Sequence, residues 1–284
     1  MHEYRTWLDK GNVTAERAKR ALPILIRQAR AEKPLTYEDL GIELGMHHRP
    51  VKTVAAYVGF TLSAIGRTHG WKRRAPPPLQ SLIVNGITGL PGHGFDNFLG
   101  PTYQKAKSKS QRLAILKAVY AETASYGNWD ELLELLQLDP APMELDEIVA
   151  SAAKSRGRGG EGPDHRALKE YVAANPALVG LREDHALGEL EYGLASGDKV
   201  DVVFTDRRRK TAVEVKSRIS SDGDVARGLF QCLKYRVVLE AQSALSEKPF
   251  NVSVALILGR DFPAALIPLR NSLGIEVIEG IQPE

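Results

Sequence analysis

Three charged side chains lie inside two apolar segments of the C-terminal half, at spacings that suit hydrolytic chemistry. Asp201 lies within the run 199–205, and Glu214 and Lys216 flank Val215. A charged group beside a sheet core is costly unless it is paired or bound to a metal. Two carboxylates can hold a hard cation such as Mg²⁺, and an ammonium group can position water and offset charge developing on a phosphate. The pattern therefore predicts metal-assisted hydrolysis of a phosphate ester.

The elements that must position these residues are two strands, predicted over 199–205 and 210–216 and joined by a basic turn. Because side chains alternate along a strand, Glu214 and Lys216 share one face of the second strand. Asp201, on the neighbouring strand, can point to that face as well. The alternative is that all three are surface residues of a half-exposed hairpin.

The whole segment after residue 160 is predicted to alternate helices and strands in the order α-β-β-β-α-β-α-β, which is a mixed α/β or α+β class. The expected bounds are a helix at 164–174, strands at 186–194, 199–205 and 210–216, a helix at 224–243, a strand at 252–258, a helix at 263–273 and a strand at 275–278. The apolar face of the helix at 224–243 is expected to contain Ala226, Leu229, Phe230, Leu233 and Val237.

This order, with an acidic residue on one strand and Glu-X-Lys on the next, resembles the PD-(D/E)XK nuclease superfamily and implies its restriction-endonuclease-like α-β-β-β-α-β core. Val200 takes the place of the proline in the superfamily's name, directly before Asp201. The segment QCLKY, from Gln231 to Tyr235, resembles the Gln-X-X-X-Tyr signature of the RecB-like branch. A spacing of four puts both residues on one helix face, and the resemblance implies that they support the site and the DNA strand.

The helix before the strands adds further candidates. In RecB-like nucleases a histidine of this helix can ligate the metal, and His165 is the matching residue. The segment 171–179 also resembles the first helix of NucS-type nucleases, in which a glutamate joins the site; Glu161 and Glu170 both remain candidates. The resemblance implies Mg²⁺ or Mn²⁺ as cofactor, metal ligands Asp201, Glu214, Val215 and His165, and catalytic residues Asp201, Glu214, Lys216, Gln231 and Tyr235.

The N-terminal part is basic although the whole chain has a formal net charge of only +3. Residues 1–110 hold 17 basic and 8 acidic side chains, residues 111–150 hold 2 and 8, and residues 151–284 hold 19 of each. A basic segment favours a polyanion as partner, and nucleic acid is the commonest one. The alternative is a solvated basic face without a ligand.

A short helix after the Thr36–Asp39 capping box, a turn near Gly45 and a longer helix at about 50–65 have the outline of a helix-turn-helix. An earlier helix is expected over 14–31, with Pro23 as a kink or as its true start. An ordinary helical hairpin with a basic surface is the alternative. The candidate DNA-binding residues are Arg49, Lys52, Arg67, Lys72, Arg73 and Arg74.

Residues 79–100 are expected to form a short strand and a glycine-rich turn that could act as a wing. From Thr36 through the basic helix into this strand, the segment resembles the winged-helix DNA-binding domain of alkyltransferases and alkyltransferase-like proteins. That family's reactive Pro-Cys-His-Arg is absent, because the matching residues 77–80 read Pro-Pro-Leu-Gln. The resemblance implies a winged-helix-like scaffold and no alkyl transfer.

Two breaks, the proline run at 76–78 and the Gly/Arg stretch at 155–160, divide the chain. The predicted parts are a basic DNA-binding domain at 1–105, an acidic helical connector at 106–155 and a nuclease-like domain at 156–284. The single cysteine, Cys232, excludes an intramolecular disulfide and a multi-cysteine zinc site, and we interpret it as a small buried hydrophobe. No apolar run is long enough for a membrane span, no secretory signal is evident and no phosphate loop indicates a nucleotide cofactor.

These observations predict a cytoplasmic, Mg²⁺- or Mn²⁺-dependent deoxyribonuclease, with DNA as its partner. Restriction, phage defence and DNA repair are roles that fit by analogy. The alternative is a non-catalytic DNA-binding regulator or lesion sensor with a nuclease-like domain. The sequence leaves open whether the chain forms a homodimer.

Overall fold

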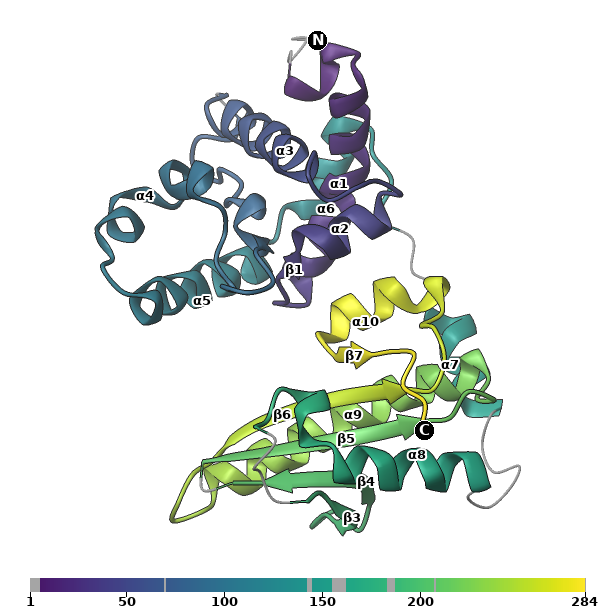
Figure 1. Cartoon of the computed structure of the whole chain (residues 1–284). Coiled ribbons are helices and arrows are strands. Elements are labelled where there is room, and N and C mark those ends of the chain that lie inside the picture. The colour runs from purple at the N-terminus through teal and green to yellow at the C-terminus, as the bar shows by residue number, and fades with distance from the viewer. Residues whose placement is uncertain are drawn as a thin grey trace. The chain divides into compact units, whose positions relative to one another are not determined.

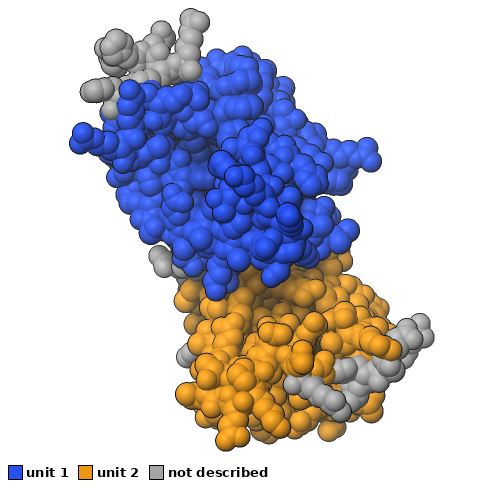
Figure 2. Space-filling view, turned by 90° about the vertical axis from the view of Figure 1, so that its left-hand side faces the viewer, with its two compact units in different colours: residues 1–143 blue, residues 144–284 orange. Residues whose placement is uncertain are grey.

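The structure, a computed structural model, describes residues 6–68, 70–141, 145–154, 162–182, 187–206 and 208–283. The chain forms two compact units, residues 1–143 and residues 144–284, which are coloured separately in Figure 2. Each unit has its own hydrophobic core, so each is described by itself.

The first unit is mainly helical. Its α-helices are α1 (Val13–Arg30), α2 (Tyr37–Glu43), α3 (Val51–Gly66), α4 (Asp96–Lys105), α5 (Lys109–Ser125) and α6 (Trp129–Leu136). Short 3₁₀ turns lie at Trp7–Lys10, Leu79–Leu82 and His93–Phe95, and two short strands are β1 (Leu35–Thr36) and β2 (Ile83–Val84). Helices α2 and α3 occupy the positions expected for the helix-turn-helix outline.

Local signals in this unit act largely as predicted. The Thr36 hydroxyl accepts from the main-chain N–H of Asp39, whose carboxylate in turn accepts from the N–H of Thr36, which completes the capping box of α2. Gly45 adopts a left-handed φ of 64° just after α2. Pro23 lies inside α1 and does not mark its start.

The segment after β2 differs from a winged hairpin. β2 pairs with β1 in parallel, through Leu35–Ile83 and Thr36–Val84, whereas a wing is an antiparallel hairpin. The following turn is held by Asn85, whose side-chain oxygen accepts from two main-chain N–H groups of the turn. This segment does not form a wing because β2 pairs with a strand almost 50 residues earlier in the chain. Local residue patterns do not encode such long-range pairing.

The second unit contains the predicted order of elements. Its helices are α7 (Leu145–Lys154), α8 (Pro163–Ala174), α9 (Asp222–Ala244) and α10 (Ile267–Leu273), with 3₁₀ turns at Pro176–Val179 and Ala264–Leu266. Its strands are β3 (Glu189–Gly193), β4 (Lys199–Thr205), β5 (Arg209–Lys216), β6 (Asn251–Leu258) and β7 (Glu276–Ile278). The mixed α and β class is therefore confirmed.

The five strands form one sheet in the order β3-β4-β5-β6-β7. The pairs β3–β4 and β4–β5 are antiparallel, and β5–β6 and β6–β7 are parallel. Helix α8 covers one face through Leu168 and Val172, and α9 covers the other through Leu229 and Cys232. Figure 1 shows α8 in front of the sheet and α9 behind it. Strands β4 and β5 thus lie between two helices.

The predicted acidic connector, residues 106–155, is divided between the units. Helices α5 and α6 belong to the first unit, and α7 packs against α9 in the second. The buried face of α9 also differs from the expected apolar face. Val237 is 57% exposed, while Tyr235 and Leu239 are buried. In the part of the chain that the structure describes, no helix is both long and apolar enough to cross a membrane.

Candidate active site

Asp201, Glu214 and Lys216 are brought together where β4 and β5 separate. Pairing between the two strands runs from Thr205–Lys210 to Val202–Val213 and does not continue to Asp201 and Glu214. β5 itself continues, paired with β6, as far as Lys216. We call this point the β4–β5 fork.

The three charged residues are not on the surface. Glu214 is 2% exposed and Lys216 8%, and 15% of the Asp201 side chain is exposed. The alternative of a half-exposed hairpin is therefore wrong, and the cost of burying charge must be met by partners at the fork.

The Asp201 carboxylate replaces a backbone partner at the fork. The main-chain N–H of Val215 donates to Asp201 Oδ2 over 2.8 Å. The carbonyl of the same residue accepts from His165 Nε2 on α8 at 3.0 Å, and that nitrogen lies 3.7 Å from Asp201 Oδ2. Val215 is thus held from both sides, which fixes the direction of its neighbours Glu214 and Lys216.

Helix α9 supplies the other half of the network. The Tyr235 hydroxyl lies 2.8 Å from Glu214 Oε2, and Lys216 Nζ donates to Glu214 Oε1. Lys216 Nζ also lies 3.3 Å from Gln231 Oε1, and Gln231 Nε2 donates to Tyr235 at 3.4 Å. The structure therefore brings both residues of the Gln-X-X-X-Tyr pattern into contact with the Glu-X-Lys pair.

Gly228 makes room for Lys216 beneath α9. A Cβ at position 228 would lie 2.9 Å from Leu256 Cδ1 and 3.2 Å from Lys216 Cε. Any larger residue would push the lysine stem away from the helix. The sequence alone does not identify Gly228 as important, because its role depends on how closely α9 packs against the sheet.

Burial dominates the electrostatics of the fork. Burial, and then the charge of Glu214, raise the pKa of Asp201 to about 6. Burial and the same glutamate raise the pKa of Tyr235 far above its usual value, so its hydroxyl stays protonated. Burial also raises the pKa of Cys232, which is fully buried as predicted and remains a thiol.

Two charged residues at the site, Lys169 and Glu191, were not predicted from the sequence. Lys169 lies one helical turn after His165, is 4% exposed and donates to Glu191 Oε1. Its Nζ lies 3.8 Å from Asp201 Oδ1. The i, i+4 spacing from His165 is the signal that could have identified Lys169.

Of the two glutamates considered for the helix, the structure describes Glu170. Glu170 is exposed, and its Oε1 lies 3.6 Å from Arg166 Nε. Glu161 lies outside the described residues.

The donors at the fork suit a hard cation. Carboxylates of Asp201 and Glu214 and the carbonyl of Val215 are oxygen ligands of the kind Mg²⁺ and Mn²⁺ prefer. Among the described residues, no group of three or more His, Cys, Asp or Glu side chains is arranged to hold a metal. The residues that fit are therefore two carboxylates with a main-chain oxygen. His165, the fourth ligand that the resemblance implies, has its Nε2 3.0 Å from that oxygen and 3.7 Å from Asp201 Oδ2.

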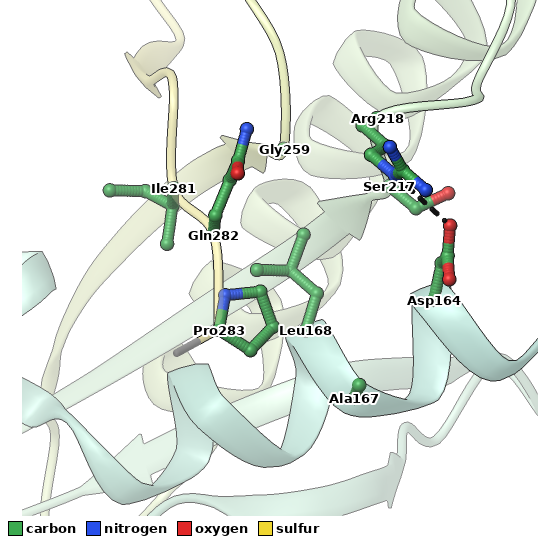
Figure 3. Close-up of a pocket in the computed structure, with 9 residues that line it drawn as sticks. All are labelled: Asp164, Ala167, Leu168, Ser217, Arg218, Gly259, Ile281, Gln282 and Pro283. Carbon is green, nitrogen blue, oxygen red and sulfur yellow. Dashed lines mark hydrogen bonds and ion pairs between the residues drawn. The ribbon is translucent and has the colours of Figure 1, made fainter.

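A cavity of about 380 Å³, shown in Figure 3, is lined by chain neighbours of the fork residues and by none of the fork residues themselves. Its walls include Asp164 and Ser217, which precede His165 and follow Lys216 in the chain, and Arg218, whose Nε lies 3.3 Å from Asp164. The remaining lining residues are Ala167, Leu168, Gly259, Ile281, Gln282 and Pro283. The cavity lies beyond the carboxyl ends of β5 and β6, the usual ligand side of parallel strands.

The basic residues predicted for DNA contact lie around α3 in the first unit. Arg49, Lys52, Arg67, Lys72 and Arg73 are exposed. Arg74 differs: its guanidinium forms two contacts with Glu131 of α6, one of them at 2.6 Å, and stacks on Trp71. Arg74 is therefore already engaged within the unit.

Comparisons of the chain with protein-family models, curated proteins and solved structures found no match. Its function must consequently be inferred from the residues and their geometry.

The raised pKa of Asp201 yields a stability prediction. The folded protein holds this proton more tightly than the unfolded chain, so stability is lost as pH rises from about 4 through about 6. We expect Asp201→Asn to raise the melting temperature of the metal-free protein at pH 8 and to have little effect at pH 4. A gain of 1 kcal/mol corresponds to roughly 2–4 °C.

Calorimetry of both proteins at the two pH values, with EDTA present, checks this. Asp261→Asn, which alters an exposed carboxylate of the same unit, is the matched control. An Asp201→Asn protein that melts lower than the parent at pH 8 would show that the charge at the fork is stabilising.

Proposed function

We propose that this protein is a metal-dependent deoxyribonuclease that hydrolyses phosphodiester bonds of DNA. The observation that carries the proposal is the buried cluster of Asp201, Glu214 and Lys216 at the β4–β5 fork, supported by Gln231 and Tyr235. A chain rarely buries this much charge without a purpose in binding or catalysis.

The surrounding topology supports the same proposal. An acidic strand, a Glu-X-Lys strand paired antiparallel to it, a long helix and then a parallel strand follow one another as the resemblance to the PD-(D/E)XK superfamily implies. Asp201 and the Glu-X-Lys pair arrive from neighbouring strands of one sheet. This agreement in order and pairing is support for a nuclease core.

The residues of the fork have separable tasks in the proposed reaction. Asp201 and Glu214, with the Val215 carbonyl, would hold Mg²⁺ or Mn²⁺, which when bound acts as a Lewis acid and lowers the pKa of a ligated water. Lys216 presents a fixed ammonium group that can orient the attacking water and offset charge on the phosphate. Tyr235 and Gln231 hold Glu214 and Lys216 in position, and His165 holds the Val215 peptide.

DNA is the substrate that the first unit favours. Its exposed basic residues around α3 would contact phosphates, and phosphate contacts supply affinity without sequence preference. The cavity at the carboxyl ends of β5 and β6 offers space for a segment of the DNA strand.

A non-catalytic DNA-binding protein is the second candidate. The observation that favours it is the direct ion pair between Lys216 and Glu214, which occupies a carboxylate oxygen that a metal would use. In that case the fork would be a structural charge network, and the chain would bind DNA without cutting it.

The first test is cleavage of linear duplex, circular duplex and single-stranded DNA with Mg²⁺, Mn²⁺ or EDTA. We expect metal-dependent cutting by the parent and a loss of about 100-fold or more in Lys216→Ala and Asp201→Ala. Lys248→Ala, which removes an exposed lysine of the same unit, should cut like the parent. Equal cutting by all four proteins would refute the site, and binding without cutting would favour the second candidate.

Salt dependence of DNA binding tests the role of the first unit. In a cleavage-deficient Lys216→Ala background, the Arg67→Ala/Lys72→Ala/Arg73→Ala variant should bind more weakly. Its plot of log affinity against log salt should be shallower by about one for each phosphate that the protein no longer neutralises. Fluorescence anisotropy over a salt series provides the measurement.

Glu131→Gln is the matched control, because it disturbs the Arg74 pair and leaves the three exposed cations in place. An unchanged salt slope in the triple variant would place the DNA contacts elsewhere.

A further inference from the structure

Lys169 is a buried ammonium group at the fork that the proposed reaction does not use. It lies on α8 with 6% of its side chain exposed, far less than is usual for lysine. Its Nζ contacts Glu191 Oε1 and lies 3.8 Å from Asp201 Oδ1. Burial of an ammonium is tolerated only when counter-charges of this kind surround it.

Glu191 reaches Lys169 from an unusual backbone conformation. It lies in the middle of β3, between the pairs Leu190–Val202 and Tyr192–Val200, and therefore opposite Asp201. Its φ of 54° is left-handed, which is uncommon for a residue with a side chain. Backbone strain of this kind persists where the surrounding structure enforces it, and it is found often at functional sites.

Lys169 lies between the carboxylates of Asp201 and Glu191, where a second metal ion could otherwise bind. Asp201 uses its other oxygen, Oδ2, for the Val215 N–H. Asp201 Oδ1 and Glu191 Oε1 are oxygen donors of the kind that a second divalent ion between these residues could take. Lys169 already contacts the latter and lies close to the former.

We propose that Lys169 is a fixed cation that takes the place of a second metal ion, so that the fork binds a single divalent cation. This inference rests on the proposed function, because it concerns the metal content of that site. Lys169 is a positioning residue: it lies near Asp201 Oδ1, as His165 lies near Oδ2, and it leaves Glu214 and Asp201 to one ion. Lys169 contacts one oxygen of Glu191, and the exposed Lys199 lies 3.9 Å from the other, while Lys216 pairs with Glu214.

The alternative hypothesis, that Lys169 forms a purely structural salt bridge, predicts a different result. If Lys169 only stabilised the fold, its removal would lower stability without changing how many ions bind. If it replaces a metal, its removal leaves two facing carboxylates, and these should recruit an additional ion.

Titration calorimetry of the full, metal-free chain with Mn²⁺ alone, without DNA, tests the proposal. We expect one ion per chain for the parent and for Lys169→Arg, which keeps the charge. Lys169→Met keeps the length of the side chain and removes its charge, and it should bind two. Lys169→Met/Glu191→Gln removes one of the two carboxylates that face position 169 and should return to one.

Melting temperature supplies a second readout. Without metal, Lys169→Met should melt below the parent, and Mn²⁺ should raise its melting temperature by more than it raises that of the parent. Lys169→Arg should respond to Mn²⁺ as the parent does.

The outcomes that would overturn the proposals are distinguishable. A parent that binds no Mn²⁺ refutes the proposed nuclease and this inference with it. A parent that binds two ions at the fork refutes the inference alone, without any variant having to fold. One ion in Lys169→Met also refutes the inference and leaves the proposed function standing.

Discussion

The hydrogen bond from the Val215 N–H to the Asp201 carboxylate is the interaction on which the fork depends. In a regular antiparallel pair this N–H would donate to a carbonyl of β4, and the two strands would remain closed. A side-chain oxygen takes over that role, so β4 diverges while β5 stays paired with β6. The same contact places a carboxylate beside Glu214 and Lys216, whose direction is set by strand alternation.

Keeping such a site buried costs stability, and the surrounding contacts limit that cost. Glu214 accepts from Lys216 and Tyr235, while His165 and Lys169, one turn apart on α8, lie near the two carboxylate oxygens of Asp201. The raised pKa of Asp201 shows that these contacts do not fully offset its burial beside Glu214. The free energy that the fold loses here is what a bound cation would recover, and this links the proposed metal site to the packing around it.

The sequence predicted the parts of the site that depend on local periodicity. Alternation along 210–216 places Glu214 and Lys216 on one face, and a spacing of four places Gln231 beside Tyr235; the structure has both arrangements. The order of helices and strands in the second unit followed from the same kind of pattern.

Features that depend on contacts between distant segments could not be predicted. Glu191 reaches the site through a left-handed residue opposite Asp201, and Arg74 is engaged by Glu131, 57 residues away. The parallel pairing of β1 with β2 likewise joins segments far apart in the sequence. The buried face of α9 is set by its packing on the sheet: a stripe that includes Val225, Cys232, Tyr235 and Leu239 faces inward, which leaves Val237 exposed.

The most direct test of the central claim is the position of Mn²⁺ in crystals of the parent protein, located by its anomalous scattering. We predict a peak coordinated by the carboxylates of both Asp201 and Glu214 at the β4–β5 fork. Mn²⁺ found only elsewhere, in a protein that cuts DNA, would contradict the claim, because the buried charges of the fork would then not be the hydrolytic centre.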